Sequence, residues 1–169
     1  MCGKFTSMVS WGQIVEYSEL FTKGSGDGGG DGGSGGEADS EITHRVNGPL
    51  RVIVWDPEAR ARKVVPMRWG FPHPRDWRRP QPIHARAETV EAKEPFRKAF
   101  HDGQRGIVVF RTFNEGKEIT KPSGKVDTEQ WTIDPQDRRG RGFAFVWRRF
   151  EIADLPQPLL ACVMVTVPA

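Results

Sequence analysis

The sequence has few of the features that mark membrane or disulfide-bonded proteins. Its 169 residues include two cysteines, Cys2 and Cys162, at opposite ends of the chain. This arrangement gives neither a disulfide framework nor the ligand spacing of a zinc site. No apolar run reaches 18 residues, and the first residues, MCGKFTSMVSWGQ, lack the basic-then-apolar pattern of a signal peptide. We therefore expect a cytoplasmic protein that has no membrane contact and needs neither a metal nor another cofactor.

Charge is weakly biased overall but unevenly distributed. The formal net charge is +3, which by itself identifies no partner. Aromatic residues lie among clustered arginines, and that mixture suits a groove that follows a nucleic-acid backbone and stacks unpaired bases. The same pattern fits a solvated surface whose tryptophans face the core, so both interpretations stay open. The arginines are Arg60, Arg62, Arg68, Arg75, Arg78, Arg79, Arg86, Arg138, Arg139, Arg141, Arg148 and Arg149.

The order of local patterns predicts an α+β fold. Apolar, β-rich segments predict strands, the first two of which form an antiparallel hairpin around the turn DPEAR. Ser10 can cap a helix over 11–21, and Glu94 and Pro95 open a second helix that closes near Gly103. Residues 24–36, GSGDGGGDGGSGG, predict a flexible surface loop. We expect one domain over 1–169 with a mostly antiparallel, barrel-like sheet and a few short helices. The strand segments are 50–56, 61–71, 106–113, 130–135, 142–150 and 159–167, the last with Cys162 in the core.

The second residue carries the most specific chemistry in the chain. Removal of Met1 would leave Cys2 with a free α-amine and a thiol on adjacent carbons. Their ordinary pKa values, about 8 and about 8.5, give both groups some nucleophilic form at neutral pH. The amine forms a Schiff base with an aldehyde, and the neighbouring thiol closes a five-membered thiazolidine ring. Cys2 therefore predicts an aldehyde substrate, although a small tolerated residue would look the same.

Four segments read together resemble a known family. MCGKFT, PMRWGF, HARAET and RTFNEG occur in this order, and together they resemble the SRAP family of abasic-site processing proteins, also called SOS response-associated peptidases. The resemblance extends from Met1 to about Ala169, interrupted by the glycine-rich loop. It implies a DNA-damage protein that forms a covalent thiazolidine crosslink with abasic sites in single-stranded DNA. It also implies a lyase-like enzyme with a peptidase activity that releases Met1.

The resemblance also implies roles for individual residues. Cys2 matches the nucleophile, and Glu115 matches the carboxylate that moves protons during Schiff-base formation and crosslink resolution. Lys4 and Arg86 match residues that contact phosphates, with lysine at position 4 where the family usually has arginine. The segment Arg68–Trp69 matches the part that grips the DNA and stacks on it around the lesion.

Two departures from the family pattern are visible. His84 precedes Ala-Arg-Ala-Glu-Thr where the family commonly has asparagine, and a neutral imidazole offers one donor and one acceptor in a different shape. His84 either contacts the opened sugar as a catalytic residue in place of that asparagine or faces elsewhere. The sequence ends at Ala169, before the family's H-x-R-M-P-like segment, which predicts a C-terminally truncated member.

Two alternative functions follow from the same residues. One is an N-terminal-nucleophile hydrolase, in which Cys2 attacks amides and Glu115 assists. The other is a truncated module that binds single-stranded DNA without chemistry. For the crosslinking protein and for the binding module, the partner is single-stranded DNA. We expect the protein to bind it as a monomer and to be associated with the nucleoid when bound.

Overall fold

A computed structural model describes residues 4–7, 42–134 and 141–168. The chain divides into two compact units, the first made of residues 1–43 and 109–141 and the second of 44–108 and 142–169. Cys2, the predicted helix over 11–21 and the glycine-rich segment 24–36 lie outside the described residues.

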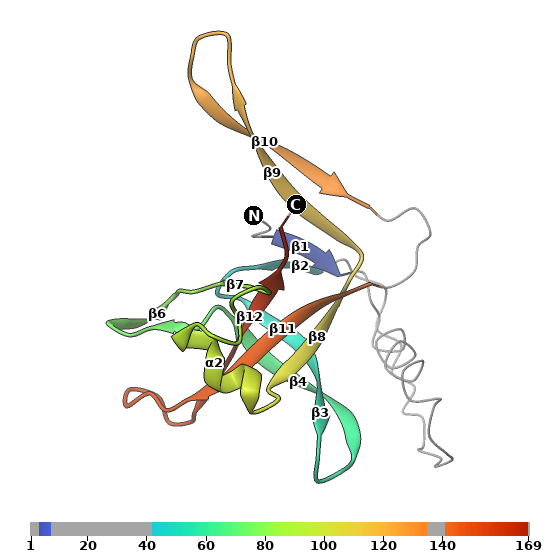
Figure 1. The fold of residues 1–169 in the computed structure, drawn as a ribbon, viewed down its shortest axis with the longest axis vertical. Helices are drawn as coiled ribbons and strands as arrows, with labels where there is room; N and C mark the ends of the chain where they lie inside the picture. The colour runs from blue at the N-terminus through green and yellow to red at the C-terminus, as the bar shows by residue number, and fades with distance from the viewer. Residues whose placement is uncertain (1–3, 8–41, 135–140, 169) are drawn as a thin grey trace. The chain divides into compact units, whose positions relative to one another are not determined.

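The second unit contains a closed five-stranded barrel (Figure 1). Around it the strand order is β11-β8-β3-β4-β12, and β12 pairs back with β11. The β3–β4, β3–β8 and β11–β12 pairs are antiparallel, whereas β12 runs parallel to both β4 and the additional strand β7. The strands are β3 (Pro49–Asp56), β4 (Ala61–Trp69), β7 (His84–Arg86), β8 (Arg105–Phe110), β11 (Arg141–Phe150) and β12 (Leu159–Thr166).

The predicted hairpin at residues 50–71 is confirmed as β3 and β4. The two strands pair antiparallel from Pro49↔Arg68 to Asp56↔Ala61. The carboxylate of Asp56 accepts hydrogen bonds from the backbone N–H groups of Glu58 and Ala59, which satisfies the donors of the turn. On β3, Leu50, Val52 and Val54 are buried, whereas Arg51 and Trp55 are exposed. Alternation is typical of a strand with one face in a core, and it is interrupted at Ile53, which is buried as well.

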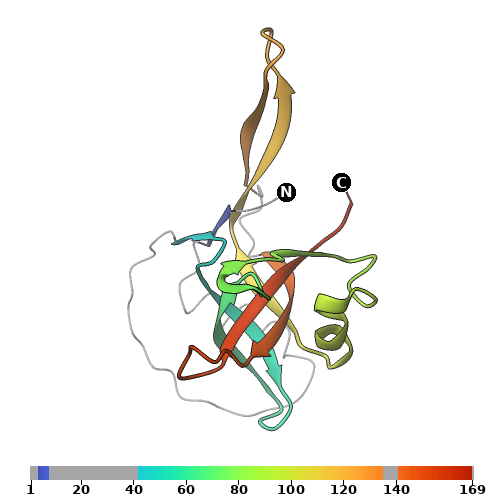
Figure 2. The same cartoon turned by 90° about the vertical axis from the view of Figure 1, so that its left-hand side faces the viewer.

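One short helix covers part of the barrel (Figure 2). Helix α2 (Glu94–His101) has Glu94 in its first turn and Lys98 in its last, which complements the helix dipole. Pro95 is its second residue, so the helix starts where the sequence predicts. Its buried face, Phe96 and Ala99, packs in a cluster with residues of the barrel strands and of the segment before the helix: Phe71, Ala85, Val90, Val146, Ala161 and Val163.

The first unit is mainly a four-stranded sheet in the order β10-β9-β1-β2. β1 pairs antiparallel with β9, and β9 forms a long antiparallel hairpin with β10 (Figure 1). The structure splits the predicted strand over 106–113 in two, because β8 ends at Phe110 and β9 begins at Thr112. The bounds are β1 (Lys4–Ser7), β2 (Ile42–Arg45), β9 (Thr112–Thr120) and β10 (Val126–Ile133).

One expectation needs correction. Within the described residues α2 is the one α-helix, so the fold is predominantly sheet with a barrel rather than α+β. The proline-rich segment 71–84 contains a small hairpin of β5 (Pro72–His73) and β6 (Asp76–Pro80). Proline is tolerated there because this two-stranded sheet needs few backbone donors. Among the described residues, no helix has the length and hydropathy required to cross a membrane.

Candidate active site

In the first unit, the start of β1 lies beside the strand that carries Glu115. Lys4 pairs in register with Asn114, and Phe5 with Phe113. Lys4 is two residues after Cys2 in the sequence, and Asn114 is the residue before Glu115. The backbone of Lys4 and that of Glu115 are therefore neighbours across one pair of strands. Phe5 is fully buried, which fixes β1 in this sheet.

Glu115 lies on β9, one residue beyond the pairs that β9 makes with β1. It is partly exposed, and its register partner on β10 is Trp131, whose side chain is 55% exposed. The amide of Asn114 donates a hydrogen bond of 2.8 Å to the hydroxyl of Thr132, which links the two strands beside this pair. Trp131 is not among the site residues predicted from the sequence, because the alternation Gln-Trp-Thr-Ile predicts an ordinary half-buried strand.

In the second unit, Trp69 and His84 are in contact. Their ring centroids lie 6.3 Å apart with the planes at 75°, an edge-on arrangement. The indole Nε1–H of Trp69 donates to the carbonyl oxygen of Ile83 at 3.2 Å, and the side chain is fully buried. In this structure the core covers the ring of Trp69, and its role in stacking on DNA stays a prediction. Its indole contacts the start of β7, the strand that carries His84.

Arg68 also binds the protein's own backbone. Its Nη1 donates to the carbonyl oxygen of Trp77 at 2.7 Å, and its Nε donates to that of Gly70 at 3.2 Å. Its Nη2 is buried with no hydrogen-bond partner among the described residues. Burial lowers the pKa of the guanidinium, because desolvation disfavours its charged form. In this structure Arg68 holds the segment that leads into the β5–β6 hairpin.

Arg86 and the β5–β6 hairpin present accessible positive charge within the second unit. Arg86 and His84 are alternate residues of β7, with the buried Ala85 between them, and Arg86 is exposed. On β6 the guanidinium of Arg78 lies over the ring of Trp77, 4.8 Å from its centroid. Arg75, Arg78 and Arg79 are all exposed. This hairpin therefore combines accessible cations with an aromatic ring, and on β11 Arg148 likewise lies over the ring of Phe150, 5.0 Å from its centroid.

Cys162 is a core residue, as the sequence predicts. Its side chain is fully buried and makes no disulfide, and burial raises the pKa of its thiol above the ordinary range. The Cys162 thiol donates weakly to the carbonyl oxygen of Arg68 at 3.6 Å. Among the described residues there is no group of three or more His, Cys, Asp or Glu side chains that could hold a metal ion.

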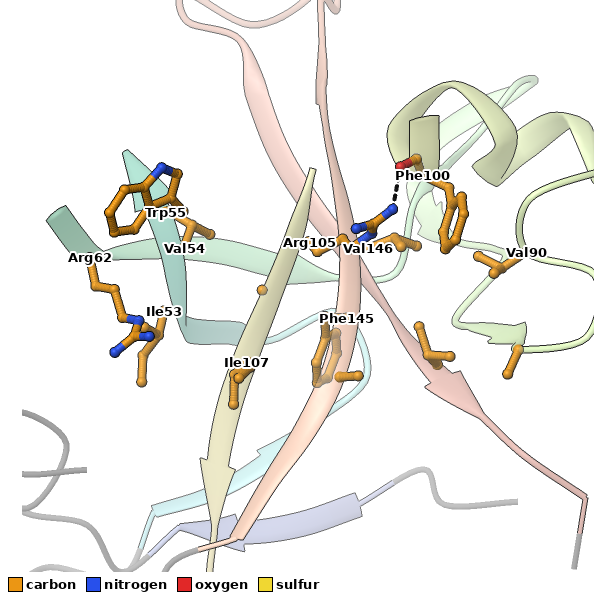
Figure 3. A pocket seen from close by; sticks show the side chains of 14 residues that line it. Ile53, Val54, Trp55, Arg62, Val90, Phe100, Arg105, Ile107, Phe145 and Val146 are labelled. Carbon is orange, nitrogen blue, oxygen red and sulfur yellow. Dashed lines mark hydrogen bonds between the residues drawn. The ribbon is translucent and has the colours of Figure 1, made fainter. Parts of the chain in front are cut away.

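A cavity of about 430 Å³ lies in the second unit, apart from these residues (Figure 3). Its lining is mostly apolar and includes two arginines, Arg62 and Arg105. Arg105 donates to the carbonyl oxygen of Phe100 at 3.1 Å and lies over that ring, 4.4 Å from its centroid. The lining contains neither His84 nor Arg86, so this cavity is not the predicted site.

The sequence motifs and the five-stranded barrel of the second unit together point to one protein family. The chain belongs to the SOS response associated peptidase (SRAP) family, whose model matches residues 1–169. The resemblance found in the sequence is thereby confirmed. No curated protein matches the chain.

Solved structures share this fold. A protein from Bordetella bronchiseptica superposes with a TM-score of 0.68 at 18% identity, covering 99% of this chain and 73% of that one. A protein from Bacteroides thetaiotaomicron gives 0.70 at 15% identity, covering 98% and 68%. A phage-related protein from Bordetella bronchiseptica gives 0.65 at 15% identity, covering 98% and 69%. At these identities the likeness concerns the fold alone.

Proposed function

We propose that this protein forms a covalent crosslink with abasic sites in single-stranded DNA through Cys2. The α-amine of Cys2 adds to the aldehyde carbon of the ring-opened sugar, and loss of one water gives the imine. The thiolate then adds to the imine carbon, and the nitrogen takes up a proton. The product is a thiazolidine, formed from one aminothiol and one aldehyde with release of one water. Ring closure is fast because both nucleophiles belong to one residue.

The register of β1 against β9 is the observation that carries this proposal. Lys4 pairs with Asn114, the neighbour of Glu115. Covalent geometry limits the separation of the Cα atoms of Cys2 and Lys4 to about 7 Å. The carboxylate of Glu115, on the strand next to β1, supports the proposed pairing of this group with Cys2.

Glu115 is the proposed proton carrier in this reaction. Imine formation requires a proton for the departing hydroxyl, and a carboxyl group near the amine can supply it and take it back in the reverse reaction. Glu115 lies on β9 beside the strand that continues from Cys2, which suits this task. His84 is the proposed contact to the opened sugar. Its ring is held by Trp69, and a fixed imidazole can donate or accept a hydrogen bond.

The DNA backbone is the proposed ligand of the exposed cations. Arg86 is accessible and can form a bidentate contact with a phosphate. Lys4 remains a proposed phosphate contact from the sequence. Arg75, Arg78 and Arg79 on the β5–β6 hairpin add cations beside Trp77. Arg68 contributes by holding this hairpin through the Trp77 carbonyl rather than by an exposed charge. Binding through such contacts weakens as salt rises.

A denaturing gel tests the proposal directly. The full chain, with loss of Met1 verified by mass, is mixed with a single-stranded oligonucleotide that carries one abasic site. We expect a band that survives denaturation and whose mass equals protein plus DNA minus one water. Cys2→Ala should abolish the band, whereas Cys162→Ala, which removes the buried thiol, should retain it. Glu115→Gln should slow adduct formation by about 100-fold, the scale of general acid–base catalysis.

Two results would overturn the proposal. One is the absence of any adduct with folded, Met-processed protein that still binds the oligonucleotide reversibly. That outcome would leave a non-covalent single-stranded DNA-binding module. The other is an adduct that persists in Cys2→Ala, which would place the chemistry on another nucleophile.

The family description favours a second activity, which is hydrolysis of a peptide bond. The bond proposed is the one between Met1 and Cys2, whose cleavage by water releases methionine and the α-amine that the crosslink needs. Inhibition of the methionine aminopeptidases of the host cell during production would give protein that still carries Met1. We expect this protein to lose Met1 on incubation, whereas the Glu115→Gln variant should retain it. Cleavage of unrelated peptides without DNA would instead favour an N-terminal-nucleophile hydrolase.

A further inference from the structure

An exposed tryptophan lies directly opposite Glu115. Trp131 is 55% exposed, although tryptophan is usually well buried in a folded domain. It belongs to β10, whose eight residues are all exposed and which forms an edge of its sheet within the described residues. Among the described residues of the first unit, no core packing therefore accounts for the indole.

Register places the Trp131 side chain on the same face of the hairpin as the Glu115 carboxylate. The two residues are direct partners in the antiparallel β9–β10 pair. Side chains at such positions share one face, with Cβ atoms roughly 4.5–5.5 Å apart. The indole is thus a neighbour of the proposed proton carrier.

The hairpin does not have the charge of a phosphate-binding surface. Between Thr112 and Ile133 it carries four carboxylates, at positions 115, 118, 127 and 129, and three lysines, at positions 117, 121 and 125. One of these lysines, Lys121, is already paired with Asp127. The charge of this hairpin therefore does not explain an interaction of Trp131 with DNA. The feature that could make such an interaction is the flat, apolar face of the indole ring.

We propose that Trp131 stacks on the nucleobase next to the abasic site, an assignment that rests on the proposed function. An abasic nucleotide has no base, so the base beside it has lost one stacking neighbour and exposes a π-face. Covering that face with an indole is favourable, and little DNA stacking has to be broken first. The contact would hold the sugar of the lesion beside Glu115.

Stacking has a recognisable signature in binding experiments. Loss of one base–aromatic contact weakens binding by about 5- to 150-fold, from alanine substitutions in single-strand binding proteins. Because the contact is uncharged, this factor should stay the same when the salt concentration is raised. A lost phosphate contact would instead reduce the salt dependence itself.

The experiment compares two tryptophans of equal exposure. Reversible binding is measured by fluorescence anisotropy in the Cys2→Ala background, with an oligonucleotide that holds one tetrahydrofuran abasic analogue. Trp131→Ala should weaken binding by the factor above at both low and high salt, and Trp131→Phe should retain most of the affinity. Trp55→Ala is the matched control, since Trp55 is 56% exposed on β3, and its affinity should be unchanged. Circular dichroism verifies that each variant is folded.

A double-mutant cycle then identifies the stacked base. The base on one side of the analogue, and then on the other, is removed by a second tetrahydrofuran unit. If Trp131 stacks on that base, its removal and Trp131→Ala each weaken binding, and the two together weaken it no further. Equal losses from Trp131→Ala with and without both flanking bases would overturn the inference, as would a loss equal to that of Trp55→Ala.

The same proteins separate this inference from the proposed function. If the Cys2-containing chain forms the crosslink and Trp131→Ala leaves the rate unchanged, stacking by Trp131 is refuted and the proposed function stays intact. If the double-mutant cycle gives the expected result but the Cys2-containing chain forms no adduct, the crosslinking function is refuted and stacking by Trp131 stays intact. Absence of any binding would refute both.

Discussion

The indole of Trp69 meets the imidazole of His84 edge-on, with 6.3 Å between the ring centroids. The same indole donates its N–H to the carbonyl oxygen of Ile83, the residue before His84. Two contacts from one buried side chain therefore fix both the backbone and the side chain at the start of β7. Since β7 also carries Arg86, the position of this arginine depends on Trp69 as well.

Replacing Trp69 by phenylalanine should destabilise the protein. Trp69→Phe removes the donor to the Ile83 carbonyl and leaves a small cavity in a fully buried site. We expect the free energy of unfolding to fall by about 1–3 kcal/mol. Urea denaturation followed by circular dichroism measures this. Trp55→Phe, at an exposed site, should stay within about 0.5 kcal/mol of the parent. Equal stability of the two variants would show that Trp69 does not hold β7.

Gly70 should tolerate no side chain, for two separable reasons. Its φ is +106°, which L side chains rarely adopt, and an added Cβ would lie 2.4 Å from Cβ of Pro80. Gly70→Ala should lower the free energy of unfolding by about 2–5 kcal/mol through strain and overpacking together. Gly103 has a φ of +71° and nothing within 4 Å of an added Cβ.

Gly103→Ala therefore isolates the backbone contribution, about 1–2 kcal/mol. Thermal and urea denaturation of the two variants side by side gives the steric part as their difference. A Gly70→Ala protein no less stable than Gly103→Ala would contradict the close approach of Gly70 and Pro80.

Local sequence patterns predicted most strands of this fold, but they predicted neither the closure of the barrel nor which tryptophans are buried. The β3–β4 hairpin and α2 follow from signals within a few residues, which are the DPEAR turn and the Glu94–Pro95 start. Closure of the barrel depends on pairs such as Cys162↔Trp69, which join residues far apart in sequence and leave no local trace. Periodicity also could not distinguish tryptophans. Trp69 lies in an arginine-rich segment but is buried, whereas Trp131 has a strand-like pattern and is exposed. Burial depends on tertiary packing, which single-sequence patterns do not encode.

His44 should make stability depend on pH near neutrality. Burial, together with the charge of Arg51, lowers the pKa of His44 below its ordinary value of 6.5, although the Pro49 carbonyl opposes this. Between the lowered pKa and 6.5, the unfolded chain binds a proton at this site that the folded chain does not. The contribution of His44 is therefore fully present above pH 6.5 and is lost as the pH falls through that window.

Urea midpoints at pH 7.5 and pH 5.5 measure this dependence. His44→Gln should lose less stability between the two values than the parent does, because glutamine does not titrate. The other histidines remain in both proteins, so their contributions cancel in the comparison. Identical pH dependence in the two proteins would show that the pKa of His44 is unshifted.

Thiol reactivity should distinguish the two cysteines completely. Cys162 is fully buried, and burial raises the pKa of its thiol, so very little of the nucleophilic thiolate exists at neutral pH. The native protein should therefore react with a disulfide reagent such as DTNB at one thiol, assigned to Cys2, and Cys2→Ala should release no thionitrobenzoate until it is unfolded in guanidinium. Pretreatment with an abasic oligonucleotide should remove the native reaction as well, because thiazolidine formation consumes the Cys2 thiol.

Rapid reaction of native Cys2→Ala would mean that Cys162 is accessible. A reactive Cys2 that the abasic oligonucleotide does not protect, under conditions where the adduct forms on a denaturing gel, would show that the crosslink is an imine without the sulfur bond.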